Sequence, residues 1–65
     1  PNPASDIITI KGIENINFIK VYSISGTLEK QVFNTNQIDI SELSSGVYLI
    51  QIDNGIKFTK KVIKL

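Results

Sequence analysis

The chain has no Cys, His, Met, Trp or Arg among its 65 residues. Without Cys it has no disulfide, and without His or Cys it lacks the usual ligands of zinc and the usual nucleophile–base pairs. Without Arg it lacks the bidentate contacts that read guanine or phosphate, and a net charge of +1 is too balanced for a nucleic-acid module. No apolar run approaches the ~20 residues that span a bilayer. We therefore expect no cofactor, no bound metal, no nucleic-acid partner and no transmembrane segment.

A chain of this length makes at most one domain and buries only roughly 60% of its unfolded surface, so all of its stability must come from apolar packing. Thirteen of the 65 residues are Ile and only one is Ala. β-Branched side chains suit a pleated, half-buried surface, whereas the scarcity of Ala disfavours helices. This composition is typical of an all-β domain.

Six apolar or alternating stretches, each bounded by turn residues, predict six strands. They are DIITIKG, NINFIKVYSISG, TLEKQVF, IDI, VYLIQI and IKFTKKVIKL. The class is all-β, and the most economical architecture is a small antiparallel β-sandwich of about six or seven strands, with a partly open barrel as the alternative. A stiff lead-in, PNPAS at residues 1–5, precedes the sandwich at residues 6–65. The missing initiator Met leads us to expect a single domain cut from a larger protein.

Local patterns make finer predictions. The second stretch is apolar on both faces, which predicts a central strand or one with a bulge near Ser23. Strict alternation places Leu28 and Val32 on one face. Ser41 is expected to cap a short helical turn that Gly46 ends in a left-handed conformation, and Asn54-Gly55 predicts a type I′ hairpin turn.

The search for catalytic chemistry finds little. Ser41, Ser44 and Ser45 precede a Gly, a pattern that usually makes a turn. The six acids are scattered singly, so no pair of carboxylates suggests glycoside hydrolysis. Asp53 and Asn54 offer oxygen ligands for calcium, but the hairpin turn already explains both residues. We expect no enzyme activity.

The lysines are distributed unevenly. Four of the seven lie in the last nine residues, with no acid among them: Lys57, Lys60, Lys61 and Lys64. One interpretation is edge protection, because lysine on an exposed strand discourages pairing with another chain. The other is a basic strip beside an open edge, which a partner reads by strand addition or charge steering. Both interpretations place the last strand at an edge.

Three segments in this order and spacing resemble one family. PNPASD at the front, SELSSGVYLIQI near the end and KKVIKL at the terminus, with VYSISGTLEKQ between them, resemble the C-terminal sorting domain of the type IX secretion system in its Ig-like form. The resemblance covers essentially the whole chain. It implies an Ig-like β-sandwich that acts as a label on a secreted protein and not as a catalyst.

The resemblance also implies partners and a route in a Gram-negative bacterium. The domain would sit behind an N-terminal cargo domain in cis. It would cross the periplasm and meet the outer-membrane translocon and its shuttle proteins. A surface sortase of the cysteine-peptidase type would then remove it, with the cargo at the cell surface or outside the cell. Cleavage in such a family falls upstream of the first strand, which would place the scissile bond before Pro1.

Residue by residue, the resemblance covers an opening motif, a Gly-x-Tyr motif and a terminal segment on which export depends. The matching residues are Pro1, Asn2, Pro3, Ala4, Gly46, Tyr48, Lys60, Lys61, Val62, Ile63, Lys64 and Leu65. Two other classes compete with this interpretation. One is an Ig-like or fibronectin-like accessory module that spaces domains or binds sugar, and the other is a self-associating structural subunit.

Overall fold

The computed structural model describes residues 6–65, and the lead-in predicted at residues 1–5 lies outside the described residues. Within them the chain forms six strands and two antiparallel sheets, β1-β4 and β3-β2-β5-β6. The bounds are Ile7–Thr9 for β1, Phe18–Ser23 for β2, Leu28–Phe33 for β3, Gln37–Asp39 for β4, Gly46–Asp53 for β5 and Lys57–Lys64 for β6. The predicted all-β, sandwich-like fold is confirmed.

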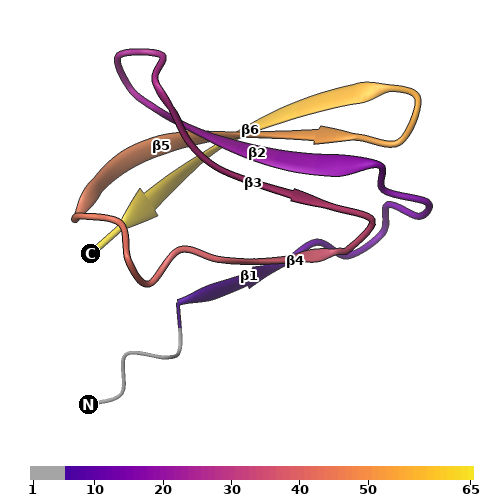
Figure 1. Ribbon diagram of the computed structural model, residues 1–65, viewed down its shortest axis with the longest axis horizontal. Coiled ribbons are helices and arrows are strands. Elements are labelled where there is room, and N and C mark those ends of the chain that lie inside the picture. The colour runs from indigo at the N-terminus through magenta and orange to yellow at the C-terminus, as the bar shows by residue number, and fades with distance from the viewer. Residues whose placement is uncertain (1–5) are drawn as a thin grey trace.

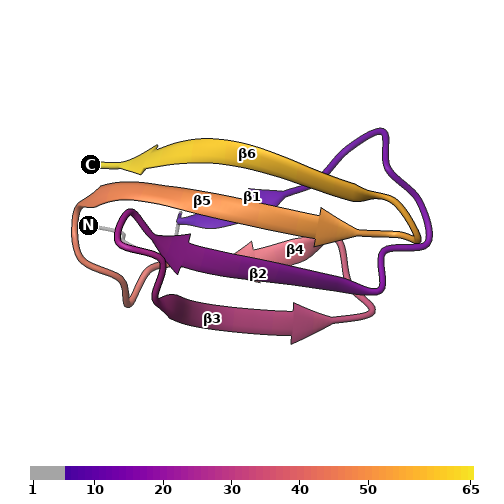
Figure 2. The same ribbon diagram turned by 90° about the horizontal axis from the view of Figure 1, so that it is seen from above.

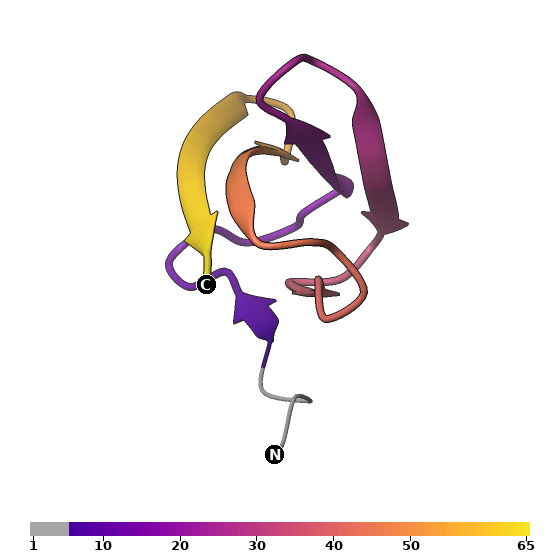
Figure 3. The ribbon, with the colours of Figure 1, turned by 90° about the vertical axis from the view of Figure 1, so that its left-hand side faces the viewer.

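The two sheets form two layers around one core. Figure 1 shows the four-stranded sheet above the short β1-β4 ribbon, and Figure 3 shows how the larger sheet curves over it. Seen from above in Figure 2, the larger sheet runs in the order β6, β5, β2, β3, with β1 on the β6 side and β4 on the β2 side. Both β3 and β6 are therefore edge strands.

Eight residues form the buried core between the layers. They are Ile16, Ile19, Val21, Ile38, Ile40, Tyr48, Ile50 and Ile52. Alternate residues of β2 and β5 supply most of them, because successive side chains of a strand point to opposite faces. The inner face of β2 is therefore the one that carries Ile19 and Val21, and Phe18 and Tyr22 lie on the outer face.

Strict alternation gave the wrong face for one residue of β3. The β2–β3 register shifts between Val21 and Tyr22, so that Val21 lies opposite Lys30 while Tyr22 lies opposite Leu28. Glu29 is the extra residue, and one inserted residue reverses the faces beyond it. Leu28 consequently shares the outer face with Tyr22 and not the inner face with Val32. The bulge expected in β2 near Ser23 is therefore wrong: the extra residue lies in β3, and β2 keeps an unbroken register with β5 from Phe18 to Ser23.

Two predicted turns also differ. The segment before β5 forms no helix, although a hydrogen-bonded turn runs from Ile40 to Leu43, and Gly46 begins β5 with φ of 156°, far from the left-handed helical region near +57°. The β5–β6 register pairs Asp53 with Lys57, so the connection has three residues. Within it φ is positive at Gly55 (102°) but not at Asn54, whereas a type I′ turn needs both. Gly26, in the turn between β2 and β3, has a positive φ of 95°, which glycine adopts without a steric penalty.

Candidate site on the C-terminal hairpin

The β5–β6 hairpin brings the Gly-x-Tyr motif and the terminal segment side by side. Gly46 lies opposite Lys64, and Tyr48 lies opposite Val62, across the last rungs of the ladder. Residues 46–48 and 60–65 are separate in sequence, but the antiparallel register brings the two segments side by side at this end of the hairpin. Pro1, Asn2, Pro3 and Ala4 lie outside the described residues.

Tyr48 anchors this end of the hairpin. Its ring is 8% exposed, and its hydroxyl donates a hydrogen bond of 2.6 Å to the carbonyl oxygen of Ser44. A Cβ on Gly46 would lie 4.0 Å from Cε2 of Tyr48, which is an ordinary contact. The stronger reason for glycine at this position is its positive φ of 156°, which other residues rarely adopt. Gly46 and Tyr48 therefore fix how the chain enters β5, and neither offers an exposed reactive group.

The first described residue reaches the last strand. The carboxylate of Asp6 lies 3.3 Å from the ammonium of Lys64, and the Lys64 side chain is only 12% exposed. The carbonyl of Asp6 also accepts a hydrogen bond from the Ile40 N–H, which extends the β1-β4 ribbon. The start of the sandwich and its C-terminal strand are thus joined directly.

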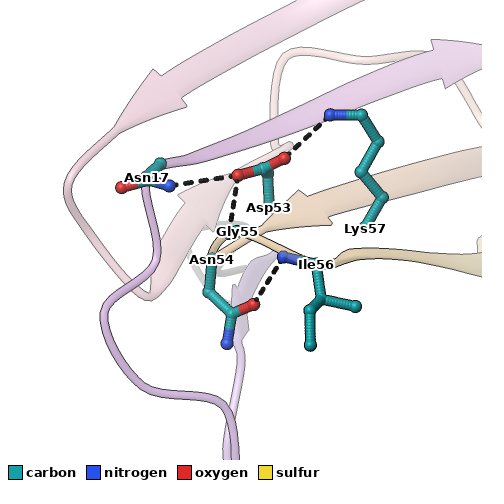
Figure 4. Close-up of polar contacts among 6 residues, drawn as sticks. All are labelled: Asn17, Asp53, Asn54, Gly55, Ile56 and Lys57. Atoms are coloured by element: carbon teal, nitrogen blue, oxygen red, sulfur yellow. Dashed lines mark hydrogen bonds and ion pairs between the residues drawn. The ribbon is translucent and has the colours of Figure 1, made fainter.

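The opposite end of the hairpin is held by Asp53 (Figure 4). One of its carboxylate oxygens accepts hydrogen bonds from the Asn17 side chain (3.1 Å) and the Gly55 N–H (3.0 Å), and the other pairs with Lys57 at 2.8 Å. These donors, with Lys57 the largest contributor, hold the pKa of Asp53 far below its usual value. Asn54 accepts a bond from the Ile56 N–H and donates one to the Glu14 carbonyl. Both residues considered for calcium therefore build the loop.

The four terminal lysines separate into two pairs. Lys57 and Lys64 are bound to Asp53 and Asp6. Lys60 and Lys61 are exposed, and neither forms an ion pair with any partner among residues 6–65. Adjacent residues of a strand face opposite sides, so Lys60 lies on the inner side of β6, opposite Ile50, and Lys61 on the outer side, opposite Leu49. The middle of the edge strand thus presents an uncompensated positive charge on both faces.

The apolar residues of the terminal segment differ in exposure. Val62 is half-buried and packs against the core, whereas Ile63 is 62% exposed and Leu65 is 98% exposed. Aliphatic side chains are exposed elsewhere on the domain as well, at Ile24 and Ile56, so exposure alone does not set this segment apart. Lys60 to Leu65 form a contiguous, partly apolar and basic strip, which we call the terminal strip.

The described residues offer no conventional reaction centre. Among residues 6–65 no three acids approach closely enough to hold a metal ion. The open groove of about 650 Å³ between the 13–16 and 34–36 loops has Glu14 as its one carboxylate, so no second acid faces it there. Ser41 donates its N–H to Asp39, and Ser44 supplies the carbonyl that Tyr48 binds, which are turn roles.

Sequence reasoning missed two residues that hold the hairpin in place, Asp6 and Asn17, and it assigned Asp53 to the turn without its partners. Asn17 meets Asp53 across 36 positions, and Asp6 meets Lys64 across most of the chain. No local pattern signals such pairs. The Asp53–Lys57 pair was accessible in principle, because a three-residue loop places these two residues opposite each other.

No helix within residues 6–65 is long and apolar enough to cross a membrane. No curated protein and no solved structure matches the chain. The family described as the secretion system C-terminal sorting domain matches residues 1–65, which is the whole sequence. With an all-β sandwich, a match over every residue and the terminal motifs gathered on one hairpin, the chain belongs to the family of type IX secretion system C-terminal sorting domains.

Proposed function

We propose that this domain directs an attached N-terminal cargo to the type IX translocon for export across the outer membrane, after which a surface sortase removes the domain. The signal comprises the lead-in Pro1, Asn2, Pro3 and Ala4, the Gly46 and Tyr48 motif, and the terminal strip. Membership of the sorting-domain family supports export to the cell surface or the medium of a Gram-negative bacterium. The periplasmic transit, the shuttle proteins and the cleavage before Pro1 are parts of the proposal.

One observation carries the assignment to the hairpin. The register sets Gly46 and Tyr48 opposite Lys64 and Val62, so the two family motifs form one structural unit. A label read after its cargo has folded must itself be a folded shape or an accessible strand. The hairpin supplies both, because Tyr48 is buried while Lys60, Lys61 and Ile63 are exposed on an edge strand.

A transfer experiment tests the proposal. Residues 1–65 are fused to the C-terminus of a fluorescent protein that folds in the periplasm, and the fusion is expressed in a type IX-competent strain and in a translocon-null strain. Fluorescence outside the cell in the competent strain alone is the expected result. Retention of an intact, folded fusion in the periplasm of both strains contradicts the proposal, provided that a longer fusion with more native upstream sequence is also retained.

A specific observation favours the accessory-module alternative. Phe33 is 61% exposed and lies opposite Phe18 on the outer face, and an exposed ring of this kind can stack on a sugar. Binding of glycans by the purified fusion, lost in Phe33→Ala, together with retention in the periplasm, would favour that function over sorting.

A further inference from the structure

A narrow apolar cleft opens between the edge strand β6 and the first strand. Its volume is about 210 Å³. Six apolar side chains line it: Ile8, Ile10, Ile13, Ile50, Ile52 and Val62. The core is therefore incompletely covered on the β6 side, where Figure 3 shows the curved sheet ending above β1.

Both strands beside the cleft have a free edge. Within residues 6–65, β1 pairs only with β4 and β6 only with β5. The segment from Asp6 to Glu14 is joined to the hairpin at both ends, by the Asp6–Lys64 ion pair and by the bond of 3.2 Å from the Asn54 side chain to the Glu14 carbonyl. Between these links, the outward N–H and C=O groups of β6 are available for a further strand.

The size of the cleft selects side chains over small molecules. Pockets for drug-sized ligands measure roughly 300–1,000 Å³. A cleft of about 210 Å³ lined by aliphatic groups is smaller than that range and suits one or two apolar side chains of an extended peptide.

The positive charge around the cleft indicates which kind of strand would bind there. Lys11 and Lys60 are exposed, and they are the two ionisable residues among the described residues that line the cleft. Lys61 adds a charge on the other side of β6. A second copy is the wrong partner, because full antiparallel overlap of two Lys57–Lys64 strands sets Lys60 opposite Lys61 and Lys57 opposite Lys64. Like charges directly opposite each other destabilise a strand pair.

We infer that β6 accepts an extended acidic segment of a partner protein by strand addition. Alternate apolar side chains of that segment enter the cleft on the Lys60 side, and its carboxylates project from the other face and bind Lys61. The Lys60 charge at the cleft favours the acidic segment at longer range. This inference rests on the proposed function for its setting, in which the partner belongs to the export machinery, and it adds the chemistry of the segment that reads the signal.

The test uses the purified reporter fusion and a fluorescein-labelled nine-residue peptide that alternates Glu and Val. One control peptide alternates Lys and Val, and the other has proline in place of the central Val, which removes a backbone donor. Fluorescence anisotropy should show binding of the Glu–Val peptide. Each control peptide should bind at least about tenfold more weakly.

Matched variants of the fusion locate the site. Lys60→Glu and Lys61→Glu should each weaken binding about tenfold. Lys20→Glu makes the same charge change on β2, which is two strands from β6, and should leave binding unchanged. Amide hydrogen exchange should slow in β6 on binding and stay unchanged in β3, the other edge of the same sheet.

Three results would overturn the inference: no binding of the Glu–Val peptide, protection on β3 instead of β6, or dimerisation of the fusion through β6. Export of the fusion without peptide binding refutes the inference and leaves the proposed function standing. Peptide binding by a fusion that is folded but not exported refutes the proposed function and supports the inference.

Discussion

Removing the last four residues, Val62 to Leu65, should abolish export while leaving the domain folded. The deletion removes the three rungs that join Tyr48 to Val62, Val47 to Ile63 and Gly46 to Lys64. It also removes the Asp6–Lys64 ion pair and the packing of Val62 on the core. The loss to the core is confined to the contacts of Val62, which lines the cleft with Ile50 and Ile52, since Ile63 and Leu65 are mostly exposed.

The size of the stability loss follows from these contacts. About two ladder hydrogen bonds contribute roughly 2 kcal/mol, half-burial of Val62 about 1, and the ion pair at most about 1. Ordering three strand residues costs roughly 1 kcal/mol or more each, which offsets most of that gain. We therefore expect a net loss below about 2 kcal/mol, against roughly 3–10 kcal/mol for a domain of this size.

Urea denaturation of the intact and shortened fusions, followed by circular dichroism, measures the stability loss, and the cell-external fluorescence measures export. A loss above about 4 kcal/mol would refute the energetic reasoning, because the terminal residues would then be part of the core. Export of the shortened fusion at the intact level would refute the assignment of the signal to the terminal strip.

Three further substitutions, with Ile24→Ala as a control, test the fold around the hairpin. Ile50→Ala should cost about 2–5 kcal/mol, because Ile50 is 1% exposed, whereas Ile24→Ala, at a side chain 70% exposed, should stay within about 0.5 kcal/mol in the same urea titration. Tyr48→Phe removes the donor to Ser44 and should cost about 1 kcal/mol in thermal unfolding; an unchanged melting temperature would argue against that bond. The pKa of Asp53 is lower in the folded state than its ordinary value of 3.8. The ionised carboxylate therefore contributes its full share of the folding stability above pH 3.8, and this share is lost as the pH falls through the folded-state pKa. Asp53→Asn should therefore destabilise the domain near pH 6 and much less near pH 2, and an equal effect at both would contradict the network.

Much of the fold was predictable because most strands follow an unbroken period of two. Ile38 and Ile40, and likewise Tyr48, Ile50 and Ile52, alternate with polar or outer residues, and all five are buried. The face of Leu28 was not predictable, because a single bulge residue, Glu29, reverses the alternation without leaving a mark in composition. The length of the hairpin loop was not predictable either, because the side chains of Asp53 and Asn54 stabilise a three-residue loop in place of the predicted two-residue turn.

The terminal strip was located correctly on an edge strand by its lysines. The state of Lys64 was beyond sequence reasoning, because only the tertiary fold brings Asp6 near it, whereas the Lys57–Asp53 pair follows from the hairpin loop. Sequence alone predicted a basic strip of four charges. In the structure, Lys57 and Lys64 are paired with acids, and the uncompensated positive charge lies on Lys60 and Lys61. These two lysines are therefore the residues to substitute. The roles of these residues in sorting remain a prediction.

The most direct test of the central claim measures the fraction of fusion outside the cell for three forms of the domain in the type IX-competent strain. These are the unaltered domain, the double variant Lys60→Glu with Lys61→Glu, and Lys20→Glu, which makes half of that charge change on β2. Both lysines of the double variant are exposed, so each substitution should change stability by no more than about 0.5 kcal/mol. Our account predicts export of the unaltered domain and the control, with the double variant folded and retained in the periplasm. Equal export of all three forms would contradict it.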